Sequence, residues 1–155
     1  MDDEDLLRLD QQICFSLHAA ARAFNAVYRT LLQDLGLTYP QYLVMLVLWE
    51  HDELAVKKIG ERLRLDSGTL SPLLKRLEAA GHVERRRSAE DERSVTVRLT
   101  EAGRALRENA VAVPRALADS TELSLDDVRD LRTRLDQLTA ALDAHSGQGA
   151  KKTAT

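Results

Sequence analysis

The stretch that decides the fold lies at residues 66–81 and reads DSGTLSPLLKRLEAAG. Asp66 or Ser67 can cap the start of a helix there, and Gly81 can close its end. One face of this helix is apolar at the i, i+3, i+4, i+7 spacing, through Leu70, Leu73, Leu74 and Leu77. The other face carries polar and basic side chains, namely Ser67, Thr69, Ser71, Lys75 and Arg76. The sequence therefore predicts a short helix that packs by its leucines and presents polar groups outward.

A shorter helix is predicted just before it, at 55–64, where Ile59 and Leu63 lie one turn apart. Two short helices joined by a few residues form a helix-turn-helix, here over 56–79, and the second helix of that motif enters the DNA major groove. Gly68 lets a phosphate approach the helix N-terminus, which favours anions. The same polar face can also be an ordinary solvated surface, so the interpretation needs support from the flanking sequence.

That support comes from residues 82–99, which read as a β-hairpin beside the second helix, in other words a wing. Its second strand alternates strictly between apolar and polar residues. Its first strand carries three consecutive arginines at 85–87, of which we expect Arg86 to contact DNA. At the tip, Asp91 can pair with Arg93 and direct its guanidinium into a minor groove. The alternative is a charged turn that only keeps the hairpin soluble.

The charge is distributed unevenly along the chain, whose net charge is −3. Residues 57–98 contain 11 Lys and Arg against seven Asp and Glu, a local net charge of +4, so the remainder carries −7. Basic charge gathered in one segment of an acidic protein is typical of a surface that binds a polyanion. The predicted partner is therefore double-stranded operator DNA.

Several other classes of function are disfavoured. The acidic N-terminus does not resemble a secretory signal, and the longest apolar run, 42–49, is far shorter than the ~20 residues of a membrane helix. We therefore expect a cytoplasmic protein with no membrane partner. The four histidines have no spacing suited to a shared metal, so we expect neither a metal nor a cofactor. Nothing resembles a phosphate loop or a Ser-His-Asp arrangement, and an enzyme is not expected.

The N-terminal part of the chain reads as two helices that precede the helix-turn-helix, within a single domain over residues 10–144. An extension at 1–9 leads into an amphipathic helix at 10–33. A second helix starts after Thr38, which can form a capping box, and it is apolar all round over 42–49. We expect that second helix to be central and buried.

The C-terminal part reads as two further helices over 101–144, the first of them bent near Pro114. Apolar residues in the last helix recur at steps of three and four from 125 to 142, which suggests helices that pack against a partner subunit. The small, polar tail at 145–155 is expected to be disordered. The predicted fold is mainly α with a small β-hairpin wing, and 10–33 and 101–144 are the predicted dimerisation helices.

Cys14 is the only cysteine of the chain and lies on the predicted N-terminal helix. Tyr28 lies within about 40° of the same helix face, but about 21 Å of helix separates the two residues. They can therefore meet only if two copies of the helix cross antiparallel in a dimer, where Tyr39 can join them. Phenol hydroxyls that donate to sulfur favour the thiolate, which attacks peroxides. The alternative is a cysteine that serves only as a small buried hydrophobe.

Particular motifs resemble a known family of bacterial repressors. Asp91-Glu92-Arg93 followed by Leu99-Thr100-Glu101-Ala102-Gly103 is similar to the wing and helix-start signature of the MarR family. The stretches CFSL (14–17), GLTYPQYLVMLVLWE (36–50) and LDSGTLSPLLKRLE (65–78) resemble its organic hydroperoxide sensor branch, OhrR. The resemblance covers about residues 6 to 143.

The resemblance implies a homodimeric winged helix-turn-helix repressor that leaves its operator when an organic hydroperoxide oxidises Cys14. In that branch the reactive cysteine is hydrogen-bonded by two tyrosines of the partner subunit, which correspond to Tyr28 and Tyr39. His18 stands where relatives commonly have a tyrosine, so a third phenol is missing. The chain also lacks a second, resolving cysteine, which implies the one-cysteine type, with a low-molecular-weight thiol as the second reactant.

Two alternatives stay open at this point. The first is a MarR-type repressor released by a non-covalent small aromatic ligand, with Cys14 as a filler. The second is a thiol peroxidase whose basic surface is incidental. Substitution of Cys14 by serine separates them. Under the first alternative the variant is still released from DNA by the ligand. Under the second the variant loses catalytic turnover, and the protein does not bind operator DNA at all.

Overall fold

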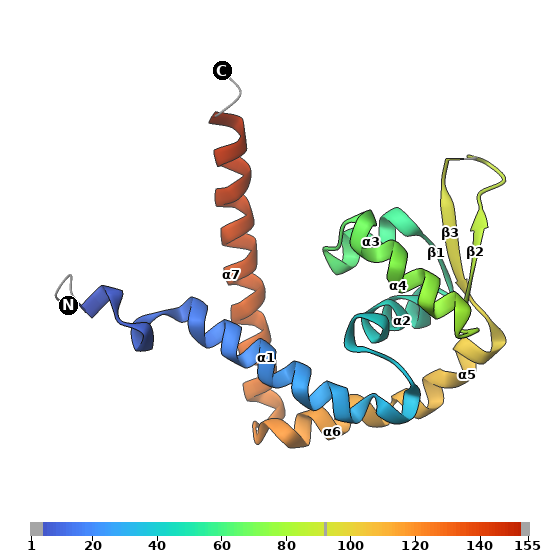
Figure 1. Cartoon of the computed structure of the whole chain (residues 1–155). Helices are drawn as coiled ribbons and strands as arrows, with labels where there is room; N and C mark the ends of the chain where they lie inside the picture. The colour runs from blue at the N-terminus through green and yellow to red at the C-terminus, as the bar shows by residue number, and fades with distance from the viewer. Residues whose placement is uncertain (1–4, 92, 153–155) are drawn as a thin grey trace. The chain divides into compact units, whose positions relative to one another are not determined.

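The computed structural model describes residues 5–91 and 93–152. The chain divides into two compact units, residues 1–117 and 118–155, and each is described by itself. In chain order the helices are α1 (Ile13–Leu31), α2 (Tyr39–His51), α3 (Val56–Leu63), α4 (Ser67–Ala79), α5 (Glu101–Ala110), α6 (Ala112–Thr121) and α7 (Leu125–Lys152) (Figure 1). The strands are β1 (Glu53–Ala55), β2 (Val83–Arg87) and β3 (Val95–Leu99), and short 3-10 turns lie at Asp5–Leu7, Leu9–Gln11 and Gln33–Leu35.

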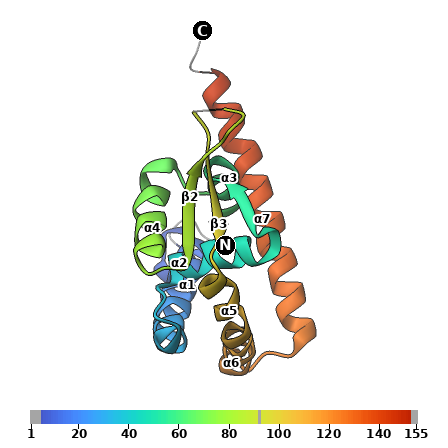
Figure 2. The same ribbon diagram turned by 90° about the vertical axis from the view of Figure 1, so that its right-hand side faces the viewer.

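The predicted helix-turn-helix and wing are both present. α3 and α4 follow each other closely, and β2 pairs antiparallel with β3, from Val83 opposite Leu99 to Arg87 opposite Val95. The hairpin projects past α3 and α4 (Figure 1), and α4 lies next to β2 (Figure 2). The winged helix-turn-helix fold predicted from the sequence is therefore confirmed.

β1 is a strand that the sequence analysis did not predict. Its residues Glu53–Ala55 pair antiparallel with 96–98 of β3, so the sheet has the order β1-β3-β2. Three residues are too few to show the alternation that identifies a strand in a sequence. The strand ends where α3 begins, and it ties the root of the wing to the end of α2.

The core of the first unit forms around α2, as its uniformly apolar sequence predicts. Val44, Met45 and Leu48 of α2 are fully buried. They share one buried cluster with Leu70, Leu74 and Leu77 of α4 and with Ile59, Val83, Val97 and Leu99. Each fully buried leucine contributes roughly 1.5–3 kcal/mol, so the apolar face of α4 anchors this helix in the core.

The start of α2 has the capping box that its sequence predicts. The Thr38 hydroxyl accepts a hydrogen bond from the Gln41 backbone amide at 3.4 Å, and the Gln41 side chain accepts one from the Thr38 amide at 3.0 Å. Two otherwise unpaired backbone donors are satisfied in this way. The capping box therefore fixes where the central helix begins.

α1 is shorter than the predicted helix over 10–33, because it begins at Ile13. The preceding residues form 3-10 turns, and the Gln12 side-chain amide donates to the carbonyl oxygens of Leu6 at 2.6 Å and Arg8 at 3.0 Å. These side-chain bonds stabilise a turn in competition with helix. No residue of α1 is buried within the described chain, although the helix is amphipathic.

The predicted helix from Thr100 to about Ala118 is divided near Pro114 into two helices, and Val111 between them keeps helical dihedral angles of φ −58° and ψ −28°. α5 ends at Ala110 and α6 begins at Ala112. Ala110 lies four residues before Pro114, whose ring clashes with the carbonyl at that position and whose nitrogen carries no proton. The proline therefore accounts for the break in the helix at Val111, close to where the sequence predicts a bend.

The second unit consists mainly of α7. Its start is capped by Ser124, whose hydroxyl accepts from the Asp127 amide at 3.1 Å while the Asp127 carboxylate accepts from the Ser124 amide at 3.3 Å. The helix continues to Lys152, so the predicted disorder over 145–155 is wrong for 145–152, and 153–155 lie outside the described residues. No proline interrupts the C-terminal part of α7, and each residue added to a helix gains one backbone hydrogen bond. Within the described residues, no helix is long and apolar enough to cross a membrane.

Candidate nucleic-acid interface and thiol site

The N-terminus of α4 is fixed by a side-chain cap. The Asp66 carboxylate accepts a hydrogen bond from the Thr69 amide at 2.7 Å. This bond lowers the pKa of Asp66, so the cap stays charged at neutral pH. All five polar residues predicted to face DNA from this helix are exposed: Ser67, Thr69, Ser71, Lys75 and Arg76. Their exposure follows from the burial of the four leucines on the opposite face.

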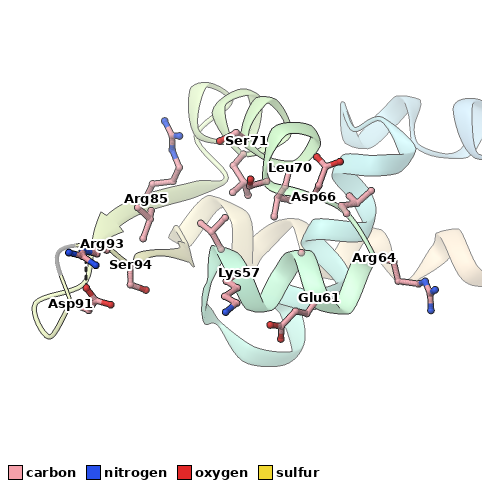
Figure 3. Close-up of a pocket in the computed structure, with 16 residues that line it drawn as sticks. Lys57, Glu61, Arg64, Asp66, Leu70, Ser71, Arg85, Asp91, Arg93 and Ser94 are labelled. Carbon is pink, nitrogen blue, oxygen red and sulfur yellow. Dashed lines mark hydrogen bonds between the residues drawn. The ribbon is translucent and has the colours of Figure 1, made fainter. Parts of the chain in front are cut away.

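A groove of about 800 Å³ lies between α3, α4 and the wing. Figure 3 shows labelled side chains from all three segments around it. Of the predicted DNA-contacting residues, Ser67, Ser71, Asp91 and Arg93 line this groove. Thr69, Lys75, Arg76 and Arg86 do not belong to its lining, so the predicted contacts divide between the groove and the outer face of α4 and the wing.

The wing tip differs in detail from its prediction. The Asp91 carboxylate accepts a hydrogen bond from the Arg93 backbone amide at 3.0 Å, and the Asp91 carbonyl accepts one from the Ser94 amide at 2.9 Å (Figure 3). The carboxylate thus stabilises the turn through the main chain, as aspartate often does. It does not hold the guanidinium of Arg93, as the sequence analysis expected, and that exposed group stays available to a partner.

The three consecutive arginines of β2 have different environments. Arg86 is exposed and donates to Glu84 at 3.1 Å, and Glu84 also accepts from Arg98 at 3.4 Å. Arg85 instead donates to Glu78 of α4, and its side chain is only 29 % exposed. The sequence shows three equivalent charges, and only the packing of β2 against α4 distinguishes them.

Cys14 lies in the first turn of α1, and its thiol is free and exposed. Its neighbours Ile13, Phe15 and Leu17 are exposed as well, by 66 %, 45 % and 36 %. Cys14 is therefore not buried within a single chain. An apolar surface of this kind around a thiol points to a partner that covers it.

The two predicted tyrosines come together within one chain. The rings of Tyr28 and Tyr39 are stacked with their centroids 4.6 Å apart, and Tyr42 lies 5.7 Å from Tyr28. Burial, with smaller contributions from Tyr39 and Tyr42, raises the pKa of Tyr28 to about 12, so its hydroxyl keeps its proton. Neither Tyr28 nor Tyr39 forms a hydroxyl hydrogen bond with any residue in 5–91 or 93–152. Both phenols are thus available as donors to an outside group.

The aromatic cluster continues beyond the predicted pair. Tyr42 contacts Trp49 edge-on at 6.3 Å, and the Trp49 indole donates to the carbonyl oxygen of Gly103 in α5 at 2.9 Å. The sequence analysis treated Tyr42 and Trp49 only as core residues of an apolar run. The only available signal was an aromatic residue at each end of that run.

No group of three or more His, Cys, Asp or Glu side chains suited to a metal ion occurs among residues 5–91 and 93–152.

Residues 26–109 match the sequence profile of a family described as transcriptional regulator SarA/Rot. The chain belongs to this family of MarR-like winged-helix transcriptional regulators. The family consists of DNA-binding regulators and not of enzymes, which removes the thiol peroxidase alternative.

Two relatives within this MarR-like family are similar over most of the chain. The regulator TtmR of Methylorubrum extorquens (strain PA1) is 51 % identical over 93 % of this chain and 74 % of its own length. The organic hydroperoxide resistance transcriptional regulator of Bacillus subtilis (strain 168) is 48 % identical over 89 % of this chain and 94 % of its own length. The resemblance to the MarR family and its hydroperoxide-sensing branch is therefore confirmed.

Solved structures of MarR-like regulators confirm the fold. Reduced AbfR of Staphylococcus epidermidis, in a structure bound to DNA, superposes with a TM-score of 0.75 at 38 % identity. The match covers 91 % of this chain and 99 % of that one. The mainly helical architecture with a small wing is thus the architecture of a DNA-binding relative.

Proposed function

We propose that this chain is a homodimeric repressor that binds operator DNA and is released when an organic hydroperoxide oxidises Cys14. The observation that carries the proposal is the combination of an exposed thiol on a helix without buried residues and two stacked tyrosines whose hydroxyls have no hydrogen-bond partner among the described residues. The similarity to the hydroperoxide resistance regulator of Bacillus subtilis supports the choice of oxidant. A repressor of this kind acts in the cytoplasm, where thiols stay reduced.

The DNA-binding half of the proposal rests on α4 and the wing. The buried leucines of α4 dock the helix, so its exposed face can enter a major groove while Arg86 and Arg93 reach the flanking backbone and minor groove. In a two-fold dimer, two such helices address half-sites about 34–36 Å apart. We therefore expect a near-palindromic operator.

The dimer half of the proposal rests on α1. A second copy that crosses antiparallel covers Ile13, Phe15 and Leu17, which are exposed in a single chain. The same crossing brings Cys14 of one subunit to the level of Tyr28 of the other, a separation of about 21 Å along one helix. Tyr39 joins the site because its ring is stacked on Tyr28.

The chemistry follows from the phenols. Hydroxyl groups that donate to sulfur stabilise the thiolate, which attacks the terminal oxygen of the hydroperoxide. An S–O bond forms, the O–O bond breaks, and the alcohol leaves after it takes up a proton, while the sulfur becomes a sulfenic acid. The chain has no second cysteine, so a low-molecular-weight thiol condenses with the sulfenic acid to give a mixed disulfide and water. The bulk of that adduct forces the phenols and helices apart.

Substitution of Cys14 tests the proposal. A mobility-shift assay uses a duplex that the wild-type protein selects from a random pool, with and without cumene hydroperoxide and a low-molecular-weight thiol. We expect Cys14→Ser to bind DNA like the wild type and to stay bound after oxidation. Ser16→Ala, at an exposed position on the same helix, is the matched control and should be released normally. Release of Cys14→Ser by hydroperoxide would contradict the proposal, and release only by an aromatic acid would favour the non-covalent alternative.

A further inference from the structure

A salt bridge joins the last turn of α4 to the wing. The Glu78 carboxylate accepts hydrogen bonds from the Arg85 backbone amide at 2.9 Å and from its Nη2 and Nε atoms at 3.0 and 3.2 Å. One carboxylate therefore holds both the main chain and the side chain of the same wing residue. A link of this kind restrains the direction of the strand as well as the position of the arginine.

The charge state and shielding of the pair favour a persistent link. The hydrogen bonds from Arg85 lower the pKa of Glu78, so the carboxylate is ionised throughout the neutral range. The side chains of Arg85 and Glu78 are 29 % and 38 % exposed, less than those of most surface ion pairs of this chain. Hydrogen bonds between charged groups are stronger and more directional than neutral ones.

The neighbouring arginines show the contrast. Successive residues of a strand point to opposite faces, so Arg86 lies on the other side of β2 from Arg85. Arg86 and Arg87 are exposed, whereas the Arg85 side chain runs from β2 towards α4 (Figure 3). Arg86 pairs with Glu84 of its own strand, whereas Arg85 links the wing to α4.

The position of this link matters for DNA binding. α4 and the hairpin are joined through a tight turn at Gly81, and the root of the wing is held there by the bond from the His82 amide to the Leu77 carbonyl oxygen at 3.0 Å and by the buried side chain of Val83. Glu78 adds a second point of attachment further out on the strand, at Arg85. A helix in the major groove and a wing tip in the adjacent minor groove must keep a fixed separation. Contacts that fix the recognition helix and the wing relative to each other therefore determine how well both fit the DNA at once.

We propose that the Glu78–Arg85 salt bridge sets the angle between the wing and the recognition helix, and that Arg85 is a positioning residue that does not contact DNA. This inference rests on the DNA-binding half of the proposed function and is independent of Cys14. It assigns a negative residue a favourable role in binding a polyanion. If Arg85 instead neutralised a phosphate, removal of the negative charge of Glu78 would strengthen DNA binding.

The decisive variant is Glu78→Gln, measured by fluorescence anisotropy with reduced protein on the selected duplex. If Glu78 only repels phosphate, its neutralisation strengthens binding. If it positions the wing, we expect binding to weaken by roughly 5- to 30-fold, the effect of losing a well-formed charged interaction. Glu90→Gln is the matched control, because it removes the same charge from the exposed wing tip and should leave affinity unchanged or slightly higher.

The salt dependence of binding distinguishes positioning from phosphate contact at Arg85. Each phosphate contact contributes about −0.9 to the slope of log K against log salt. We expect Arg85→Gln to weaken binding without changing the slope, and the double variant with Glu78→Gln to be no weaker than either single variant. Arg85→Lys keeps the charge but loses the fork geometry, so it should also weaken binding.

Two results would overturn the inference. One is Glu78→Gln protein that is folded, by its circular dichroism, and binds at least as tightly as the wild type. The other is an Arg85→Gln slope reduced by about 0.9 together with an Arg85→Lys affinity equal to that of the wild type. Wild-type protein that selects no duplex at all would instead refute the DNA-binding proposal itself.

Discussion

Among the glycines of the first unit, Gly103 leaves the least room for a Cβ atom. It lies in the first turn of α5, where its amide donates to the capping hydroxyl of Thr100 at 3.1 Å. A Cβ atom at this position would overlap the His82 carbonyl oxygen and lie 3.0 Å from the His82 carbonyl carbon and 3.2 Å from Leu99 Cδ2. His82 directly precedes β2, so the glycine permits α5 to approach the root of the wing. The substitution Gly103→Ala therefore tests how the wing is seated.

The expected change in stability of Gly103→Ala is the difference between a gain in helix propensity and a cost of overpacking. In an open helix, replacing glycine by alanine stabilises a protein by about 1 kcal/mol. Here the carbonyl carbon must retreat by about 0.5–1 Å to reach an ordinary contact of 3.5–4.0 Å, and the oxygen must retreat further. Overpacking costs about 1–3 kcal/mol, and we take about 2–3 kcal/mol here because the carbonyl carbon and oxygen are backbone atoms that cannot swing aside like the end of a side chain. We expect a net destabilisation of about 1–2 kcal/mol, or a melting temperature lower by about 3–8 °C.

Thermal unfolding followed by circular dichroism and by the fluorescence of Trp49, the single tryptophan, measures the effect. The indole donates to the Gly103 carbonyl, so its emission reports the same region. Gly147→Ala is the matched control, because a Cβ there meets nothing within 4 Å, and it should be neutral or slightly stabilising. A Gly103→Ala protein as stable as Gly147→Ala, with unchanged DNA affinity, would refute the reasoning.

Three further predictions concern Arg93 at the wing tip, the hydroxyl of Tyr28 and the dependence of stability on pH. Arg93→Ala should lose affinity mainly on operators with A·T-rich flanks, and equal losses on A·T- and G·C-flanked duplexes in a binding assay would exclude a minor-groove role. Tyr28→Phe should slow the oxidation of Cys14 about tenfold in stopped-flow measurements, because a lost hydrogen bond to the thiolate raises the thiol pKa; an unchanged rate would exclude the phenol as a donor. The hydrogen bond from Arg104, 2.6 Å from Nε to the carboxylate, lowers the pKa of Asp52, so this contribution to stability is present above the ordinary carboxyl pKa and is lost as the pH falls through the lowered value. The difference in melting temperature between the wild type and Arg104→Gln should therefore shrink on acidification, and a difference independent of pH would contradict it.

The elements with strong local signals were predictable from the sequence. The leucine spacing of α4, the Thr38 capping box and the apolar run of α2 each reflect rules that act within a few residues. The grouping of Cys14, Tyr28 and Tyr39 came from helix geometry and from resemblance to a family. The structure brings the two tyrosines together by stacking their rings, and the approach of Cys14 to them stays a prediction.

The parts that the sequence did not reveal depend on contacts between distant segments. β1 exists only because β3 offers an edge to three residues, and Arg85 differs from Arg86 only because α4 lies beside one face of β2. Periodicity alone does not show which charges are already paired within the fold.

The most direct test of the account measures DNA release and the mass of Cys14 on the same samples. Wild-type protein on its selected duplex is treated with increasing cumene hydroperoxide in the presence of a low-molecular-weight thiol, and each sample is divided between anisotropy and intact-mass spectrometry. We predict that the fraction of DNA released follows the fraction of protein carrying the mixed disulfide at Cys14, and that a reductant reverses both. Release without any change in mass, or complete modification of Cys14 with the DNA still bound, would contradict the central claim.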